Sequence, residues 1–270
     1  MSLATLDARF PQKRAVVTGG ASGLGLAAAE LLAARGWRLA LLDRDAERLA
    51  AATARLVTLG SPLAEGSAVD VTDEAGVRIA IDRFVVRCGG LDLALNSAGV
   101  AVAGDLLETP EADWRWILDI NVMGIVQSCR AEWPHLVAAG GGLIVNVASA
   151  AAFACGARMG AYNASKAAVV ALSETLYQEG RAHGVQVTAA MPGFFRTRLM
   201  EQARAPADAR GFALRMMARS NLEADTVARE ILERAAAGAS HVVLPATYRW
   251  LWRLKRLAPR SFLRRMARRD

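Results

Sequence analysis

Short apolar runs alternate with longer stretches of helical periodicity along most of the chain. Residues 14–18 (RAVVT) and 37–42 (WRLALL) are short and apolar, whereas residues 26–36 (LAAAELLAARG) repeat their apolar positions at helical spacing. Runs of this length are typical of strands buried on both faces, as in a parallel sheet covered by helices. The alternation predicts an α/β fold: a single doubly wound, Rossmann-type parallel sheet with helices on both faces.

The pattern predicts one domain followed by a short extension. No Gly-, Ser- or Pro-rich linker, low-complexity block or repeat divides the 270 residues, a length that suits one large domain or two small ones. We assign the domain to residues 1–245 and the extension to residues 246–270. The N-terminus lacks the apolar core of a signal peptide, and no long apolar run occurs. These features predict a cytoplasmic protein that does not span a membrane.

Most of the positive charge belongs to the extension. The chain has a formal net charge of +7, but residues 246–270 hold nine basic residues and one acid, which leaves residues 1–245 nearly neutral. No nucleic-acid reader motif is present, and the basic residues are not spread over the domain. Nucleic acid is therefore an unfavoured partner.

The extension is predicted to be a basic amphipathic helix, divided into two pieces by Pro259. Such a helix suits peripheral contact with an anionic membrane. Packing onto the domain or onto a second subunit is the alternative. One helical stripe holds Arg249, Arg253, Arg256 and Arg260, and a different face holds Trp250, Leu251, Leu254 and Leu257.

Neither a metal site nor a disulfide framework is indicated. The cysteines, Cys88, Cys129 and Cys155, are far apart and form no Cys-x-x-Cys pair. The three histidines also lack the i, i+4 spacing of a helical metal site. We expect no bound metal.

A glycine-rich turn joins the first apolar run to the first helical stretch. Residues 19–25 read GGASGLG, with the glycines arranged as G-x-x-x-G-x-G. Such a turn lets the backbone approach a pyrophosphate, and the following helix N-terminus directs free N–H groups toward it. Glycines also occur in tight turns that bind nothing. In this strand-to-helix context we predict a dinucleotide site that includes Gly19, Ser22, Gly23 and Leu24.

Asp43 ends the second apolar run, near the spacing at which an acidic residue accepts hydrogen bonds from the adenosine ribose. A carboxylate there repels a 2′-phosphate, which favours NAD over NADP. Arg44 lies next to it and offers a cation for that phosphate. Asp43 is alternatively an ordinary strand-end or helix-capping residue.

With these motifs in order, the sequence resembles the short-chain dehydrogenase/reductase family from about Lys13 to Pro245. Ser97 replaces the second Asn of the family's usual Asn-Asn-Ala-Gly segment, and Ser22 stands where NADP-dependent members often carry a basic residue. The second difference again favours NAD. The motifs are TGGASGLG (18–25), DV (70–71), NSAG (96–99), DINVMG (119–124), LIVNVAS (143–149) and YNASK (162–166).

The resemblance implies roles for individual residues. It also implies a homodimer or homotetramer, and a substrate lid after Pro192. The catalytic tetrad matches Asn121, Ser149, Tyr162 and Lys166; the further cofactor contacts match Asp70, Val71, Asn96, Ala98, Gly99, Pro192, Gly193 and Thr197, with Tyr162 and Lys166 also contacting the cofactor.

Tyr162 and Lys166 are the candidate residues for proton transfer in the interconversion of an alcohol and a carbonyl compound. Oxidation of an alcohol removes its hydroxyl proton, and the reverse reaction returns that proton. Tyr162 and Lys166 are four residues apart in a helical stretch, so they share a face, and a nearby ammonium is expected to lower the tyrosine pKa. Ser149 ends a buried-type strand, where its hydroxyl can orient the substrate oxygen. The resemblance gives Asn121 a water-holding role.

Residues 192–222 mix apolar side chains with arginines. The apolar content suggests a hydrophobic substrate, with an acidic group facing Arg196, Arg198 or Arg215 as a hypothesis. The alternative is a set of amphipathic helices with solvated arginines that cover the core.

Together these features predict an NAD(P)-dependent oxidoreductase that transfers a hydride between the cofactor, preferably NAD, and a hydrophobic alcohol or ketone. Tyr162 would act as the general acid/base. A catalytically silent NAD(P)-binding scaffold or sensor is the alternative function. The sequence does not identify the substrate or the direction of the reaction.

Overall fold

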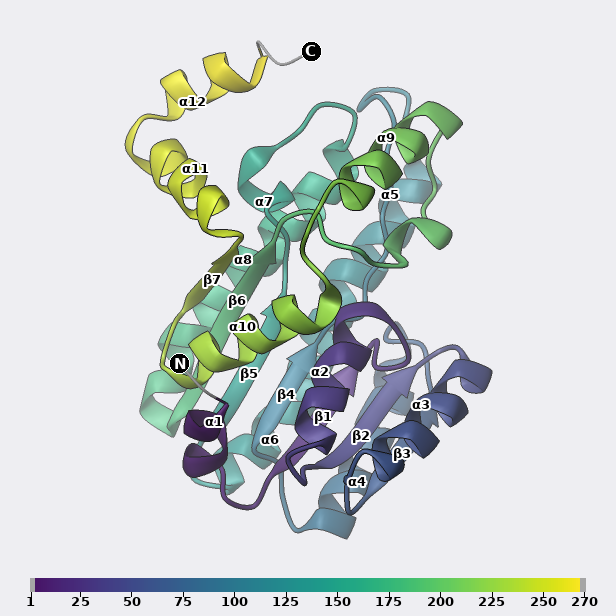
Figure 1. Cartoon of the computed structure of the whole chain (residues 1–270), viewed down its shortest axis with the longest axis vertical. Helices are drawn as coiled ribbons and strands as arrows, with labels where there is room; N and C mark the ends of the chain where they lie inside the picture. Colours follow the sequence, from purple (N-terminus) through teal and green to yellow (C-terminus); the bar gives the residue numbers. More distant parts are fainter. Residues whose placement is uncertain (1–2, 268–270) are drawn as a thin grey trace.

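Seven strands pair in parallel in the order β3-β2-β1-β4-β5-β6-β7 in the computed structural model, which describes residues 3–267 (Figure 1). Most of them are short apolar runs buried on both faces, as the sequence pattern predicts. The strands are β1 (Arg14–Thr18), β2 (Arg38–Asp43), β3 (Ala64–Ala68), β4 (Leu93–Asn96), β5 (Gly142–Val147), β6 (Val185–Pro192) and β7 (His241–Leu244).

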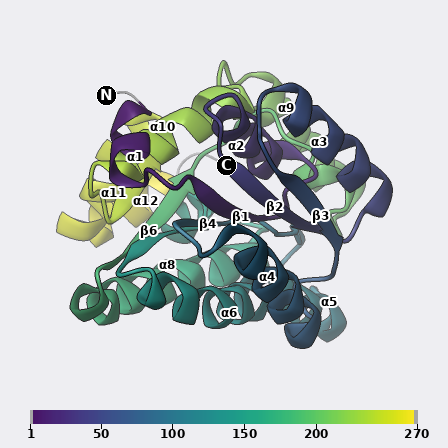
Figure 2. The ribbon, with the colours of Figure 1, turned by 90° about the horizontal axis from the view of Figure 1, so that it is seen from below.

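Two helical layers cover the sheet, one on each face (Figure 2). Each layer buries its own apolar cluster against the strands, so the sheet is the centre of the core. The doubly wound fold is confirmed. One layer contains α1 (Ala4–Arg9), α2 (Gly23–Ala33), α3 (Ala46–Thr58) and α10 (Ala224–Ala236), and the other contains α4 (Glu74–Cys88), α6 (Gly124–Ala138) and α8 (Gly160–Gly180).

The direction of winding reverses between β1 and β4. The chain moves outward from β1 through β2 to β3 and then returns to the other side of β1. Connections from neighbouring strand ends then lead to opposite faces, and a crevice opens at the carboxyl edge of the sheet. The fold therefore positions a ligand site at the ends of β1 and β4.

Shorter elements lie at this carboxyl edge. They include α5 (Glu111–Leu118), the π-helical turn η1 (Asp119–Met123), α7 (Ala151–Ala154), η3 (Leu199–Glu201) and α9 (Ala207–Ala218), while the 3₁₀ turn η2 (Arg181–His183) precedes β6. The helical pattern around Asn121 is therefore interrupted. A π-helical turn separates α5 from α6, and such turns are frequent at functional sites.

The extension forms two helices, α11 (Ala246–Leu257) and α12 (Pro259–Met266), divided at Pro259 as predicted. It packs onto the domain, beside β7. The face that packs inward overlaps the predicted apolar face only in part. Leu251 contacts the core together with Tyr248 and Trp252, whereas Trp250 and Leu257 are exposed. Within residues 3–267, no helix is long and apolar enough to cross a membrane.

Candidate active site

A cavity of about 1230 Å³ occupies the crevice at the carboxyl edge of the sheet. It runs from the glycine turn after β1, past the ends of β4 and β5, to the segment after β6. Most of the predicted site residues line it, as they should if each follows the carboxyl end of a strand.

The glycine turn is shaped so that side chains would not fit in it. Gly19 has φ +64°, and a Cβ there would lie 2.8 Å from backbone atoms of Ala98. A Cβ on Gly25 would lie 2.3 Å from the Gly19 carbonyl oxygen. Gly23 has φ +54° and begins α2. The bare backbone and the helix N-terminus form a cradle that fits a pyrophosphate.

Asp43 ends β2 and lines the same cavity. Its carboxylate accepts hydrogen bonds from the backbone N–H groups of Ala21 and Asp45, both at 3.1 Å. The capping of α3 belongs instead to Asp45, whose side chain accepts from Arg48 N. Asp43 therefore holds the glycine turn and is not the helix cap. Arg44 also lines the cavity, and its guanidinium donates to Gln202.

The third strand end supplies Asp70 and Val71, which both line the cavity. The Asp70 carboxylate accepts from the Thr72 backbone N–H at 2.9 Å and from the Thr72 hydroxyl at 2.8 Å. Val71 is buried and lies so close to Gly124 that a Cβ there would be 2.7 Å from its side chain. These contacts fix both residues beside the crevice.

The structure does not bring Asn96 to the cavity. Ala98 and Gly99 line it, but Asn96 is fully buried beneath it. Asn96 Nδ2 donates to Glu132 Oε2 and to Asn146 Oδ1, both at 3.0 Å. The predicted direct contact of Asn96 with a cofactor is therefore not possible from this position. Its side-chain amide instead connects β4 to β5 and α6.

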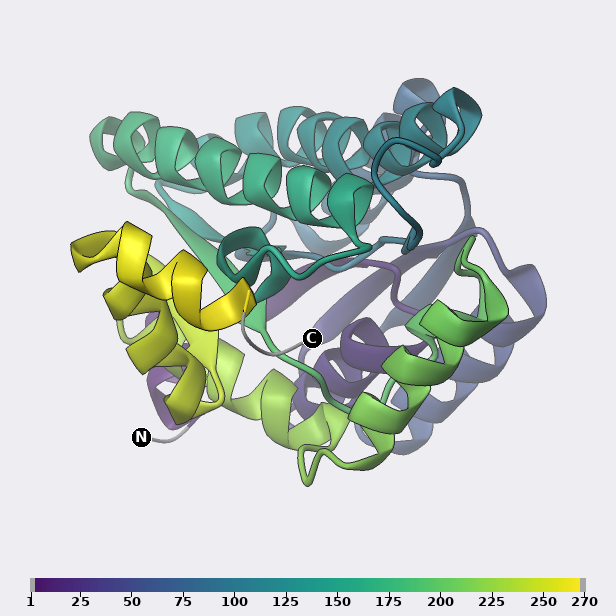
Figure 3. The same cartoon turned by 90° about the horizontal axis from the view of Figure 1, so that it is seen from above.

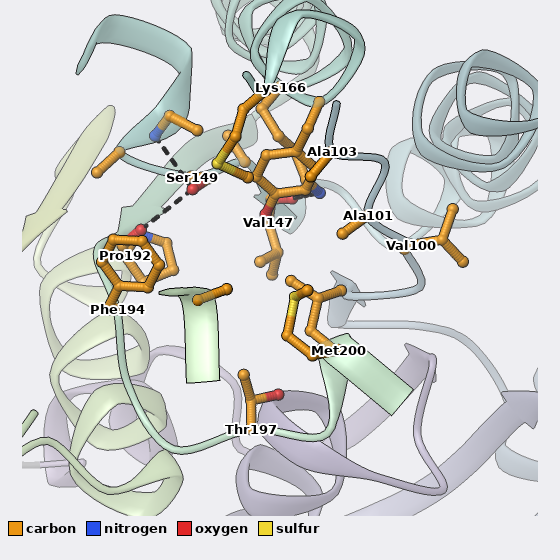
Figure 4. A pocket seen from close by; sticks show the side chains of 18 of the residues that line it. Val100, Ala101, Ala103, Val147, Ser149, Lys166, Pro192, Phe194, Thr197 and Met200 are labelled. Atoms are coloured by element: carbon orange, nitrogen blue, oxygen red, sulfur yellow. Dashed lines mark hydrogen bonds between the residues drawn. The ribbon is translucent and has the colours of Figure 1, made fainter. Parts of the chain in front are cut away.

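Ser149, Tyr162 and Lys166 all line the cavity, and Figure 4 shows Ser149 and Lys166 there. Ser149 follows β5; its hydroxyl donates to Pro192 O at 3.4 Å and accepts from Ala151 N at 3.1 Å. Lys166 Nζ donates to Val147 O at 2.9 Å and lies 5.9 Å from the centre of the Tyr162 ring. Strand end and helix face thus converge as predicted.

Asn121 lies just behind this group. Its Oδ1 accepts from Val100 N at 2.8 Å, and its Nδ2 donates to Val100 O and to Ser165 Oγ, both at 3.0 Å. It is fully buried and does not line the cavity. A Cβ on Gly99 would lie 3.1 Å from Asn121 Oδ1 and 3.3 Å from Lys166 Nζ, so Gly99 leaves room for both side chains.

Burial sets the proton affinities of the two titrating groups. It raises the pKa of the Tyr162 hydroxyl, and hydrogen bonding with Ser149 opposes that shift. It lowers the pKa of Lys166 to about 8. The expectation that Lys166 lowers the tyrosine pKa is therefore wrong for the protein alone. The Lys166 ammonium lies over the Tyr162 ring and donates its hydrogen bond to Val147 O, and burial is the largest cause of the tyrosine pKa shift.

Pro192 ends β6, Gly193 and Thr197 follow it, and all three line the cavity. Pro192 O also accepts from Ala150 N at 2.8 Å, which ties this turn to the segment after Ser149. Thr197 Oγ1 faces the glycine turn, where a Cβ on Gly23 would lie 3.1 Å away.

The comparisons agree with this geometry. The family model described as short chain dehydrogenase matches residues 13–208. The chain belongs to the short-chain dehydrogenase family. As a member, it is an NAD(P)-dependent oxidoreductase that acts on CH–OH groups.

Several short-chain dehydrogenases are similar over most of their length. D-threitol dehydrogenase of Mycolicibacterium smegmatis is 40% identical over 73% of this chain and 75% of its own length. Cis-4-hydroxycyclohexanecarboxylate dehydrogenase of Sinomonas cyclohexanicum is 36% identical over 87% of this chain and 93% of its own. A crystal structure from Burkholderia phymatum, in complex with NAD, is 32% identical with a TM-score of 0.84, covering 91% of this chain and 94% of that one.

Sequence reasoning missed the part of the site that the extension supplies. A signal was available, since Tyr248, Leu251 and Trp252 stand at helical spacing. The separation of arginines from leucines on the helical wheel instead indicated the face that holds Trp250 and Leu257. The cavity-lining residues of the extension are Tyr248, Leu251, Phe262, Leu263, Met266 and Ala267.

Proposed function

We propose that this protein interconverts a hydrophobic alcohol and its ketone, with NAD as the preferred cofactor and Tyr162 as the general acid/base. One observation carries the proposal: the Tyr162 and Ser149 side chains line the same cavity as the glycine cradle and Asp43. That combination fits a proton-transferring group and a dinucleotide in one site. The alternative, a silent NAD(P)-binding scaffold, gives no reason for Ser149, Tyr162 and Lys166 to converge.

Each residue has a separate task. A bound nicotinamide dinucleotide would supply or accept the hydride. The Ser149 hydroxyl orients and polarises the substrate oxygen, and Tyr162 donates its proton to that oxygen or removes it. Because burial raises the tyrosine pKa, Tyr162 carries its proton at neutral pH. This state suits reduction of a carbonyl, whereas oxidation of an alcohol should become faster as the pH rises.

The residues around the cradle favour NAD. A carboxylate held at the end of β2 by two backbone N–H groups stays next to the position of the adenosine ribose, where it would repel a 2′-phosphate. The Arg44 guanidinium is turned to Gln202. The similar structure from Burkholderia phymatum was solved with NAD.

An acidic group on the substrate would form an ion pair with Arg215. Arg196 and Arg198 are paired with Glu223 and Glu201, each at 2.6 Å. Arg215 lines the cavity and forms no ion pair within residues 3–267. The hydroxycyclohexane carboxylate named for the Sinomonas relative combines an apolar ring with such a group.

A second role, contact with an anionic membrane surface, is supported by the outer face of α11. Trp250 is 65% exposed and Leu257 is 86% exposed, and the exposed Arg253 belongs to the same helix. Aromatic, aliphatic and cationic side chains together suit the boundary between headgroups and acyl chains. Cosedimentation of the full chain with anionic vesicles, and its loss in a Trp250→Ser, Leu257→Ser double variant, would support this role. Equal recovery of both proteins in the supernatant would rule it out.

We also propose a homodimer or homotetramer, on the family resemblance alone. Light scattering on the protein as it elutes from a size-exclusion column measures the mass of the assembly and so tests this proposal.

The decisive experiment is calorimetric titration with NAD and NADP in both redox states, combined with a screen of apolar secondary alcohols and ketones. We expect tighter binding of NAD than of NADP. Tyr162→Phe should reduce turnover by roughly a thousandfold, a far larger effect than its effect on cofactor affinity. Tyr177→Phe, on the same helix but outside the cavity, is the matched control. Tight binding with no turnover by the wild type would favour the scaffold alternative.

A further inference from the structure

The C-terminal helices take part in the cavity itself. Four apolar side chains, those of Leu251, Phe262, Leu263 and Met266, line the same cavity as Tyr162. Figure 3 shows α11 and α12 on one side of the strand ends and α9 on the other. The substrate end of the cavity is therefore bounded by two helical walls that are far apart in the sequence.

The first helix, α11, is seated on the domain by ring contacts. Tyr248 lies against Gly193, where an added Cβ would be 2.0 Å from the tyrosine ring, so only glycine allows this approach. Trp252 lies against His241 of β7, with ring centroids 5.4 Å apart. These two contacts hold α11 beside the turn that follows β6.

The second helix, α12, is anchored by Phe262. This side chain is 1% exposed, although the helix around it is largely exposed and basic. Lys255 of α11 lies over the Phe262 ring, 5.9 Å from its centroid, and its Nζ donates to Cys155 Sγ at 3.2 Å. Cys155 follows α7 and also lines the cavity. One lysine thus connects α11, α12 and the segment after Ser149.

The opposite wall also carries apolar side chains, beside Arg215. Phe194 and Met200 point into the cavity (Figure 4), and Phe212 and Met216 of α9 line it further out. Residues 246–267 contain no acidic side chain. The space between the walls thus offers apolar contact area.

We propose that α11 and α12 form a specificity-determining wall, in which Leu263 and Met266 bind an apolar portion of the substrate that extends away from the reacting carbon, while the buried Phe262 holds α12 in place. The inference rests on the proposed function and deepens it, because it predicts selection by the length of the apolar portion. A short ketone would reach Ser149 and Tyr162 without touching α12. A long one would bury its chain against α12.

The test measures binding of 2-butanone, 2-octanone and 2-dodecanone to the NAD-saturated full-length protein by calorimetry. A ketone cannot be reduced when the cofactor is oxidised, so the readout is affinity alone. The wild type should bind more tightly as the chain lengthens, by roughly threefold to fourfold per buried methylene. Leu263→Ala and Met266→Ala should weaken 2-dodecanone binding by about tenfold and leave 2-butanone and NAD affinities unchanged.

Leu257→Ala is the matched control, because it removes an apolar side chain of the same helix pair that does not line the cavity. It should behave as the wild type does. Neither substitution changes the buried anchor Phe262, so both variants should fold. The proposal is overturned if both cavity variants keep the wild-type dependence on chain length, or if the wild type has none. A wild type that binds no NAD would contradict the proposed function, and this inference with it.

Discussion

The two ends of the cavity are built in different ways. At the cofactor end, the cradle, Asp43 and the Asp70–Val71 pair each lie within a few residues of a strand end. At the substrate end, the walls come from α9 on one side and from α11 and α12 on the other, and they face one another only because these helices pack around the same strand ends. The first end depends on local backbone geometry and the second on tertiary packing, so they should respond differently to substitution.

Backbone geometry at the cofactor end predicts the largest effect. Gly19→Ala should weaken NADH binding by about hundredfold, because the new Cβ would lie 2.8 Å from Ala98 and the turn would have to move. A positive φ is unfavourable for alanine in any case, by about 1 kcal/mol. Fluorescence titration with NADH measures the loss.

Gly36→Ala separates the two causes. Gly36 also has a positive φ, +76°, but a Cβ added there would have no other atom within 4 Å. This variant should lose about 1 kcal/mol of stability and keep its NADH affinity. If Gly19→Ala and Gly36→Ala bind NADH equally well, close approach of the backbone is not what shapes the cradle.

A buried polar cluster of Asn96, Glu132 and Asn146 predicts an intermediate effect, on the pH dependence of stability. Burial raises the pKa of Glu132 to about 7, and the hydrogen bond from Asn96 acts the other way. Glu132 Oε1 and Asn96 Oδ1 lack partners within residues 3–267. A proton on the carboxyl supplies the donor that this pair of acceptors needs.

The sign of the pH dependence follows from that shift. The folded pKa lies above the ordinary value of 4.5, so the contribution of Glu132 is complete below about pH 4.5 and is lost as the pH rises through about 7. The loss should reach on the order of 3 kcal/mol at alkaline pH. Urea denaturation should show that Glu132→Gln removes this slope, while the exposed Glu179→Gln does not. An unchanged slope in Glu132→Gln would contradict the assignment.

The same contrast explains what the sequence could predict. The parallel sheet, the cradle and the convergence of Ser149 with Tyr162 and Lys166 follow from short motifs whose geometry is local: a strand end, a glycine turn, a four-residue helical spacing. The burial of Asn96 could not be predicted in this way. Its partners Glu132 and Asn146 come from α6 and β5, and no local pattern relates them.

The inward face of α11 could not be predicted, for a related physical reason. A helical wheel separates polar from apolar residues, but it does not say which face meets the domain. Here the Tyr248 ring packs against Gly193, and the Trp252 ring packs against His241. The raised pKa of Tyr162 is likewise a consequence of how deeply the assembled fold buries it. Such outcomes depend on packing partners that one segment does not encode.

The smallest effect should be found at the substrate end, where Arg215 is an exposed cation that forms no ion pair within residues 3–267. Arg215→Ala should lower kcat/KM for a hydroxycyclohexane carboxylate by about tenfold and leave the uncharged cyclohexanol unaffected, because only the acid gains from the guanidinium. Arg219→Ala, one turn further along and outside the cavity, is the matched control. Because Arg215 is solvent-exposed, added salt should reduce the difference between the two substrates. Equal losses on both substrates would mean that Arg215 supports the wall of α9 and does not recognise charge, and the substrate end would then select by apolar shape alone.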